Sequence, residues 1–171
     1  MKGNYKTAPG AMLVLAVFFQ ASSFAATREM MEEKDRDGDG RKETKVYFEN
    51  GQIVRMLSDK NNDKKTDETV VFKNGVPSRG EKDANFDGKS DTWTDYDASG
   101  YPVLVARDKR GRGKADTWIH AKNGFVHRRE WDRNFDGKPD FRIEERGGRL
   151  IQKESDNNFD GKFETIDKAP R

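Results

Sequence analysis

The chain has 171 residues, of which 32% are hydrophobic and 37% are charged, and it contains no cysteine. A composition this polar supports only a thin hydrophobic core, so either something else helps to hold the chain together or the chain is disordered. The lack of cysteine excludes disulfide bonds and a lipid-anchored lipoprotein.

Residues 1–25 are typical of a secretory signal peptide. Lys2 and Lys6 precede an apolar run, and Ser23 and Ala25 supply the small residues expected before a cleavage point after Ala25. The apolar run is shorter than the about 20 residues that a membrane-spanning helix needs, and an uncleaved N-terminal anchor is the alternative. We therefore expect a periplasmic or secreted protein that has no membrane span after cleavage.

Cleavage also changes the charge balance of the chain. Residues 1–25 hold two of the 33 basic residues and none of the 31 acidic residues, so the remaining chain carries 31 of each sign. A formally neutral chain lacks the basic surface typical of nucleic-acid-binding proteins. We therefore expect no nucleic acid partner.

Residues 26–34 are expected to be a short N-terminal linker, in which 27–34 either form one helical turn or fray. Residues 35–171 are expected to form one repeat domain. A nine-residue acidic loop recurs six times, and successive loops start 24, 24, 25, 24 and 24 residues apart. Such constant spacing is the signature of a repeat architecture. The six loops begin at Asp35, Asp59, Asp83, Asp108, Asp132 and Asp156.

Between the acidic loops lie two short β-type runs separated by a tight turn. Asn50-Gly51, Asn74-Gly75 and Asn123-Gly124 supply the positive φ that a type I′ hairpin turn requires. The extra residue of the third repeat falls at its turn. Strands are predicted at 44–49, 52–58, 69–73, 76–82, 92–97, 101–107, 117–122, 125–131, 141–146 and 149–155.

The predicted fold is all-β: an antiparallel β-hairpin meander of about eleven strands, with tight turns along one edge and acidic loops along the other. Val46, Val70 and Ile119 fall in one column, and the strand period of two places Trp93 and Trp118 on the opposite face. The sequence leaves open whether the twisted sheet stays open, closes into a barrel or folds into a sandwich.

The acidic loops follow the pattern D-x-(D/N)-x-D-G-x-x-(D/E), which suits calcium. Calcium takes about six to eight oxygen ligands in a flexible shell. Side chains at positions 1, 3, 5 and 9 and the backbone carbonyl at position 7 can supply them, while glycine at position 6 permits the reversal. An EF-hand is excluded, because position 12 lacks the bidentate glutamate.

The predicted calcium ligands belong to five of the six loops, with the position-7 residue contributing only its carbonyl. They are Asp35, Asp37, Asp39, Arg41 and Glu43; Asp59, Asn61, Asp63, Lys65 and Asp67; Asp83, Asn85, Asp87, Lys89 and Asp91; Asp132, Asn134, Asp136, Lys138 and Asp140; and Asp156, Asn158, Asp160, Lys162 and Glu164.

These loops resemble the calcium-binding β-hairpin loops of FG-GAP repeats and the aspartate-rich loops of thrombospondin type 3 repeats. The hairpin segment at 96–101, Tyr-Asp-Ala-Ser-Gly-Tyr, looks like the Tyr-Asp repeats of RHS-type surface proteins. The match to the calcium loops covers only the nine-residue loops and not the whole repeat unit. The resemblance implies a secreted or surface bacterial β-repeat protein.

The loops are not expected to be equivalent. The loop from Asp35 carries four acids and is expected to bind calcium best. The loop from Asp59 has Lys64 where glycine is preferred, which predicts strain in a left-handed conformation. The loop from Asp108 has Arg110 and Arg112 at ligand positions, so we expect an ion pair between one of them and Asp108 or Asp116 in place of calcium.

Aromatic residues in the repeats have two interpretations each. Phe86, Phe135 and Phe159 recur at position 4 of three loops, where they either pack each loop onto its neighbour or form a ridge that binds a partner. Trp93 and Trp118 either pack against the sheet or form a sugar-stacking platform. A zinc site and a glycosidase carboxylate pair are not expected.

The sequence therefore predicts an exported, non-enzymatic calcium-binding repeat protein with a structural or adhesion role, in which calcium stabilises the fold. The alternative is a glycan-binding protein that uses the tryptophan face with calcium assisting. An envelope protein or an anionic glycan is the expected partner besides calcium ions.

Overall fold

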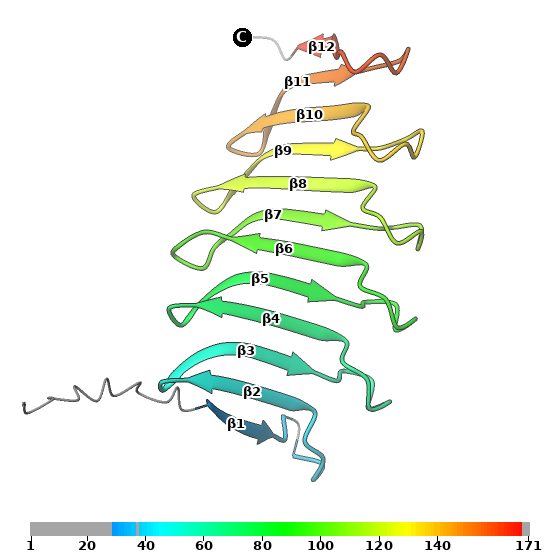
Figure 1. Ribbon diagram of the computed structural model, residues 1–171. Coiled ribbons are helices and arrows are strands. Elements are labelled where there is room, and N and C mark those ends of the chain that lie inside the picture. Colours follow the sequence, from blue (N-terminus) through cyan, green and yellow to red (C-terminus); the bar gives the residue numbers. More distant parts are fainter. Residues whose placement is uncertain (1–28, 37, 169–171) are drawn as a thin grey trace, which may run out of the picture.

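A computed structural model describes residues 29–36 and 38–168, so the predicted signal peptide at 1–25 and the predicted ligand Asp37 lie outside the described residues. Twelve strands form one open antiparallel sheet in which every strand pairs only with its neighbours in sequence (Figure 1). This confirms the all-β hairpin meander. The strands are β1 (Glu29–Lys34), β2 (Thr44–Glu49), β3 (Gln52–Ser58), β4 (Glu68–Lys73), β5 (Val76–Lys82), β6 (Thr92–Tyr96), β7 (Pro102–Arg107), β8 (Thr117–Lys122), β9 (Phe125–Trp131), β10 (Phe141–Arg146), β11 (Arg149–Ser155) and β12 (Glu164–Lys168).

All ten predicted strands are present, and their ends agree with the prediction to within one residue. The helical turn or frayed segment expected at 27–34 is wrong, because residues 29–34 form the edge strand β1. Pairing with β2, from Lys34 opposite Thr44 to Glu29 opposite Glu49, gives this polar segment a set of backbone hydrogen bonds. Within 29–36 and 38–168, no helical segment has the length and apolar character that crossing a bilayer requires.

The tight turns form as predicted. Asn50 and Gly51 have φ of 51° and 78°, and Asn123 and Gly124 have 52° and 78°, the two positive values of a type I′ turn. The inserted residue of the third repeat does fall at its turn, where the Asp97 side chain accepts the N–H groups of Ser99 (2.8 Å) and Tyr101 (3.0 Å).

Each hairpin also carries a β-bulge that the sequence did not reveal. Tyr47 lies opposite Arg55 but Phe48 lies opposite Ile53, which leaves Val54 as an extra residue on the returning strand. A bulge bends its strand and increases the local twist, so a bulge in every hairpin adds curvature near the turn edge. The extra residues of the five hairpins are Val54, Ser78, Val103, His127 and Ile151.

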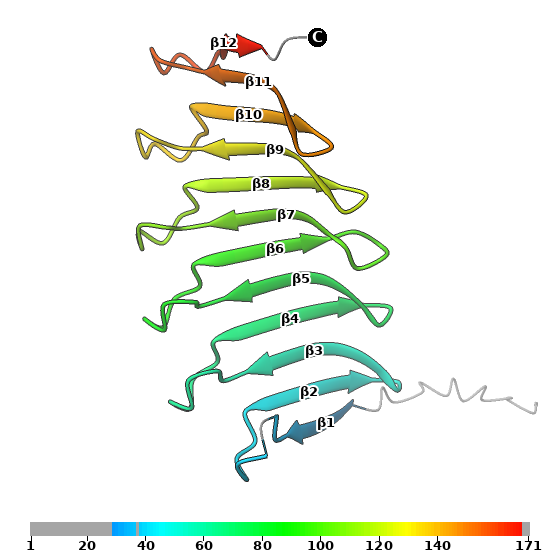
Figure 2. The ribbon, with the colours of Figure 1, turned by 180° about the vertical axis from the view of Figure 1, so that it is seen from behind.

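Figures 1 and 2 show that the sheet is a single layer. Its buried hydrophobic side chains lie on both faces: Val46 and Val70 share one row, whereas Ala106, opposite Trp93 and Trp118, lies on the other face. Val46 lies opposite Met56, and Met56 lies opposite Val70. In the part of the chain that the structure describes, the buried hydrophobic residues are Val46, Val70 and Ala106. The predicted thin core is confirmed, and the sheet must gain much of its stability from hydrogen bonds and cross-strand pairs.

Substitution in this row is expected to cost more stability than substitution on the other face of the same strand. Val70 is 8% exposed and its neighbour Val71 is 41% exposed. Val70→Ala should lower the free energy of unfolding by about 1.5 kcal/mol, because two buried methyl groups are lost. Val71→Ala, which changes β-propensity equally, should lower it by less than about 0.5 kcal/mol. Urea denaturation measures both, and equal losses would contradict the burial of β4 on its Val70 face only.

Candidate metal centre

The backbone hydrogen-bond ladder of the sheet continues into the first and last residue of each acidic loop. The Asp67 N–H donates to the Ser58 carbonyl (2.8 Å) and closes the second loop at its base. The Asp83 N–H donates to the Asp67 carbonyl (2.7 Å) and ties the third loop to the second. Equivalent bonds at the other loops stack all six along one edge of the sheet (Figure 2).

The aspartate at position 1 shapes each loop through its carboxylate. In all six loops its Oδ2 accepts the N–H of position 6 at 2.5–2.8 Å. Position 6 has positive φ throughout, for example 89° at Gly88. Lys64 occupies this position in the second loop with φ of 71°, which confirms the predicted left-handed conformation of a residue that is strained there.

Positions 3, 5 and 7 form a second layer of bonds inside the loops. In four loops the asparagine at position 3 accepts the N–H of position 5 at 2.9–3.1 Å. The aspartate at position 5 accepts the N–H of position 7 at 2.8–2.9 Å in five loops. The five donors are the predicted position-7 residues Arg41, Lys65, Lys89, Lys138 and Lys162.

The acid at position 9 accepts hydrogen bonds from the first residues of its own loop. Asp67, Asp91 and Asp140 each accept the N–H groups of positions 2 and 3 through one oxygen, at 2.6–3.2 Å. Most acids at positions 1 and 9 are also buried; these are Asp67, Asp83, Asp108, Asp116, Asp132, Asp140 and Asp156. Buried carboxylates are tolerated only when donors or cations compensate them, and here backbone N–H groups supply part of this compensation.

The first loop brings three predicted ligands together. Ligand oxygens of Asp35, Asp39 and Glu43 all lie within 4.8 Å of one another, with Asp35 and Asp39 exposed and Glu43 half-buried. Among residues 29–36 and 38–168, no other group of three or more acidic or histidine side chains converges this closely. The described residues therefore contain a possible acidic metal site in the loop that was expected to bind calcium best.

Two buried oxygens at predicted ligand positions have no hydrogen-bond partner. They are Oε1 of Glu43, at position 9 of the first loop, and Oδ1 of Asp59, at position 1 of the second. The other oxygen of each carboxylate accepts a backbone N–H, from Arg36 (3.1 Å) and Lys64 (2.8 Å) respectively. An unsatisfied buried carboxylate oxygen is costly unless a water or a cation completes it, so these donor sets fit a bound cation.

The remaining predicted ligands share the loop frame but do not converge in the same way. In the loops from Asp83, Asp132 and Asp156, the acids at positions 1, 5 and 9 do not come within 4.8 Å as a group. In the loops from Asp83 and Asp132, aspartate at position 9 is one methylene shorter than Glu43 and its Oδ2 is turned to the N–H groups of positions 2 and 3. A cation there would have to reorganise the position-9 side chain.

The loop from Asp108 differs from its prediction. The expected ion pair of Arg110 or Arg112 is wrong: the two guanidinium carbons lie over the ring of Phe135 in the next loop, 4.1 and 4.3 Å from its centroid. Backbone N–H groups serve the Asp108 carboxylate instead, from Gly113 (2.5 Å) and Arg110 (3.2 Å). Burial opposes ionisation of Asp108, yet these N–H groups outweigh it and lower its pKa.

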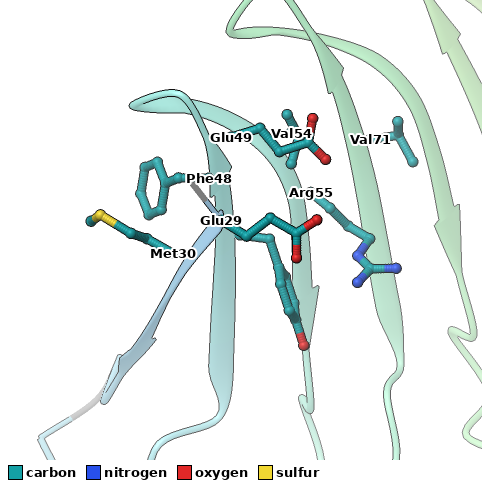
Figure 3. Close-up of a pocket in the computed structure, with 8 residues that line it drawn as sticks. Glu29, Met30, Phe48, Glu49, Val54, Arg55 and Val71 are labelled. Carbon is teal, nitrogen blue, oxygen red and sulfur yellow. The ribbon is translucent and has the colours of Figure 1, made fainter. Parts of the chain in front are cut away.

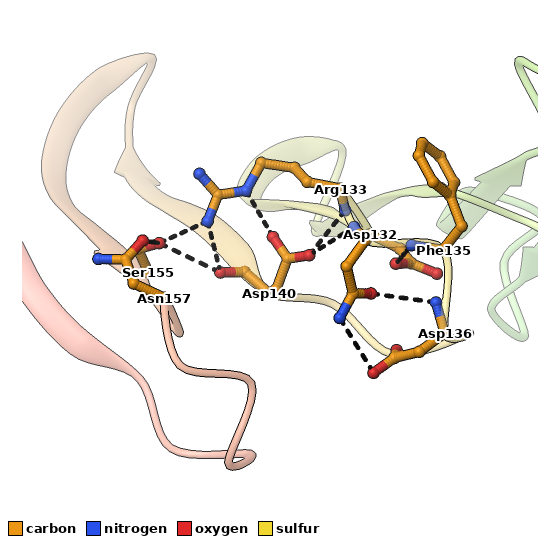
Figure 4. A network of polar contacts seen from close by, with 8 residues as sticks. Asp132, Arg133, Phe135, Asp136, Asp140, Ser155 and Asn157 are labelled. Carbon is orange, nitrogen blue, oxygen red and sulfur yellow. Dashed lines mark hydrogen bonds and ion pairs between the residues drawn. The ribbon is translucent and has the colours of Figure 1, made fainter.

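An arginine of the fifth loop connects that loop to the neighbouring strand (Figure 4). Arg133, at position 2, donates from Nε to Asp140 Oδ1 (2.5 Å) and from its terminal NH2 group to Ser155 Oγ (2.5 Å) and the Asp140 carbonyl (3.2 Å). A built-in cation thus joins the buried Asp140 to β11. Position 2 varies among the loops, so no sequence pattern indicated this role.

Of the phenylalanines at position 4, one packs on the neighbouring loop, and two are exposed, which leaves the interpretation as a partner-binding ridge open. Phe135 packs beneath the two arginines of the preceding loop, whereas Phe86 and Phe159 are 44% and 52% exposed. All three have positive φ, between 59° and 64°, which is unfavourable for a bulky side chain.

A separate pocket lies at the turn end of β1, β2 and β3 (Figure 3). It has a volume of about 400 Å³ and is lined by Glu29, Met30, Tyr47, Phe48, Glu49, Val54, Arg55 and Val71. The Arg55 guanidinium carbon lies 4.4 Å from the centroid of the Tyr47 ring. The pocket contains none of the predicted ligands and is not part of the acidic-loop edge.

No protein-family model matches this chain, and no curated protein matches it in sequence.

Asp108 generates a prediction about pH. Its native pKa is lowered from the ordinary value of 3.8, so its ionised form stabilises the folded state above that value, and the contribution is lost as pH falls through the native pKa. Asp108→Asn should lower the free energy of unfolding by about 1 to 2 kcal/mol at neutral pH. The difference from wild type should shrink below about pH 4.

Urea denaturation at several pH values measures this difference. Asp95→Asn is the matched control, because Asp95 is an exposed strand residue outside the loops. A pH-independent deficit in Asp108→Asn would show that lost packing, rather than lost ionisation, causes the effect.

Proposed function

We propose that this chain is an exported calcium-binding repeat protein in which calcium stabilises the fold, with a structural or adhesion role and no enzymatic activity. The convergence of Asp35, Asp39 and Glu43 within 4.8 Å carries the proposal. The buried, unpartnered Glu43 Oε1 supports it independently, because a cation would satisfy this oxygen.

Calcium suits the first loop better than other common cations. The ligand set contains only carboxylate and backbone oxygens, which favours calcium or magnesium over zinc or copper. Magnesium demands near-ideal octahedral geometry and retains several waters, whereas calcium accepts a flexible, crowded oxygen shell. Clustered carboxylates on an exposed loop therefore match calcium.

A structural role follows from where the loops lie. Position 1 of each loop is bonded to position 9 of the preceding loop, for example Asp59 N–H to the Glu43 carbonyl at 2.8 Å. A cation held by Glu43 would neutralise acids at the point where two repeats meet. Binding to the folded state alone stabilises it, by about 2.7 kcal/mol at a concentration 100 times the dissociation constant.

Calcium added to chelator-treated protein is expected to raise the melting temperature by about 5 to 10 °C, the shift that this binding energy produces in a domain of this size. Glu43→Gln should lose a large part of the shift, because it removes a charged ligand. Differential scanning calorimetry measures the shift, and magnesium at the same concentration should produce a smaller one.

Glu49→Gln is the matched control, since Glu49 is an exposed acid of β2 outside the loops. It should retain the wild-type calcium response. No shift in wild type at millimolar calcium, or an equal response in both variants, would overturn the proposal for the first loop.

Glycan binding by the tryptophan face is the second candidate function. Trp93 lies opposite Ala106, and Ala106 lies opposite Trp118. The register therefore places two indoles on one sheet face, two strands or about 10 Å apart, with the buried Ala106 between them. Flat aromatic rings on an uncovered face suit stacking against sugar rings.

Trp93→Ala with Trp118→Ala should abolish retention on polysaccharide resins if this face binds glycans. Trp131→Ala is the control, because Trp131 packs on Phe141 with ring centroids 5.5 Å apart. Trp131 lies opposite Thr117, next to Trp118 along β8, and so faces the other side of the sheet. Pull-down with and without calcium separates the two candidates. Retention of binding by the folded double variant would exclude the tryptophan face.

A further inference from the structure

The loop from Asp108 to Asp116 presents two arginines at the loop edge of the sheet. In the other loops, positions 3 and 5 hold Asp or Asn; here they hold Arg110 and Arg112. Neither guanidinium forms an ion pair or hydrogen bond through its side chain within the described part of the chain, and both residues are exposed. Their N–H donors are therefore available to a ligand.

The two guanidinium groups are nevertheless held in place. Both lie over the ring of Phe135, with guanidinium carbons 4.1 and 4.3 Å from the ring centroid. Cation–π contact favours this arrangement and reduces the rotamer freedom that a ligand would otherwise have to remove. The backbone at Phe135 is held in turn, because its N–H donates to Asp132 Oδ1 at 2.6 Å.

The positive charge around Arg110 and Arg112 comes from their own loop. The loop carries four cations, at Lys109, Arg110, Arg112 and Lys114. Its two acids, Asp108 and Asp116, are buried and bonded to backbone N–H groups of the same loop. The solvent-facing side of this loop is therefore cationic, whereas the flanking loops expose charges of both signs, such as Asp87 with Lys89 and Asp136 with Lys138.

We infer that Arg110 and Arg112 form a binding site for an anionic polysaccharide, that is, one whose sugars carry carboxylate or sulfate groups. Planar guanidinium groups with free N–H donors bind such oxyanions in bidentate fashion. Phe135 orients the two groups, and Lys109 and Lys114 add long-range attraction. The site differs from both the calcium loops and the tryptophan face, and it needs neither of them.

The neighbouring loops favour a polysaccharide over nucleic acid. Loops recur about every 10 Å along the edge, and the flanking loops expose the acids Asp87 and Asp136 together with Lys89 and Lys138, so the purely cationic surface is one loop wide. A nucleic acid duplex carries one charge per about 1.7 Å of its axis and would meet these acids on both sides. A short fragment of an anionic polysaccharide can place its groups on the arginines of one loop without reaching these acids.

Binding of polygalacturonate and dextran sulfate fragments to the chelator-treated protein tests the site, with neutral dextran and an oligonucleotide as further probes. Isothermal titration calorimetry of Arg110→Gln with Arg112→Gln should show an affinity loss of at least about 10-fold for one or both anionic glycans. Arg146→Gln with Arg149→Gln is the matched control: it removes the same charge from exposed arginines at the turn edge and should stay within about 2-fold of wild type.

Two further variants distinguish specific binding by the two guanidinium groups from nonspecific electrostatic attraction to the loop. Arg110→Lys with Arg112→Lys keeps the charge but loses the planar fork, and Phe135→Leu keeps an apolar contact but loses the ring, so both should weaken binding. Equal loss in the turn-edge control, undiminished binding by the lysine variant, or tighter binding of the oligonucleotide would overturn the inference. Because calcium is absent, failure here leaves the calcium proposal unaffected.

Discussion

Backbone hydrogen bonding between neighbouring strands is the interaction on which the described structure depends, because no second layer covers its sheet. Each strand pairs only with strands adjacent in sequence, so each repeat is stabilised by the next one. Bonds such as Asp83 N–H to the Asp67 carbonyl, at 2.7 Å, extend the ladder beyond the strands. The acidic loops thereby acquire the regular spacing of the sheet.

Cross-strand side-chain contacts are mainly apolar in the N-terminal part of the sheet and mainly ionic in its C-terminal part. The row that starts at Val46 is apolar as far as Ile119 on β8, apart from Gly80 and Thr94, but continues as Arg129 on β9. In the C-terminal half, cross-strand ion pairs replace apolar contacts, among them Arg128 to Glu144 at 2.8 Å and Arg142 to Glu154. The hydrogen bond to Glu154 raises the pKa of Arg142. Half-buried pairs of this kind contribute more than exposed pairs, which are worth little.

A common loop frame allows the repeats to differ in chemistry. Asp108 still accepts the N–H of Gly113 at 2.5 Å although positions 3 and 5 of its loop are arginines. The frame is therefore set by position 1 and by the residue at position 6, and it does not require acids at the other ligand positions. The loop from Asp35 brings three carboxylates together. In the loop from Asp132, Arg133 forms a hydrogen-bonded bridge, and the loop from Asp108 exposes two arginines. All three loops share the same backbone conformation at position 6.

The sequence by itself determined the repeat, the strands, the tight turns and the positions of the acids, because period, alternation and Asn-Gly pairs are local signals. It also indicated that Asp35, Asp39 and Glu43 belong together, since they share one loop. Only the tertiary structure decided the five bulges, the strand β1 and the open sheet, because these depend on pairing between strands. It alone placed Arg110 and Arg112 on Phe135, and Arg133 between Asp140 and Ser155, because such contacts join different loops and strands whose separation in space no local pattern encodes.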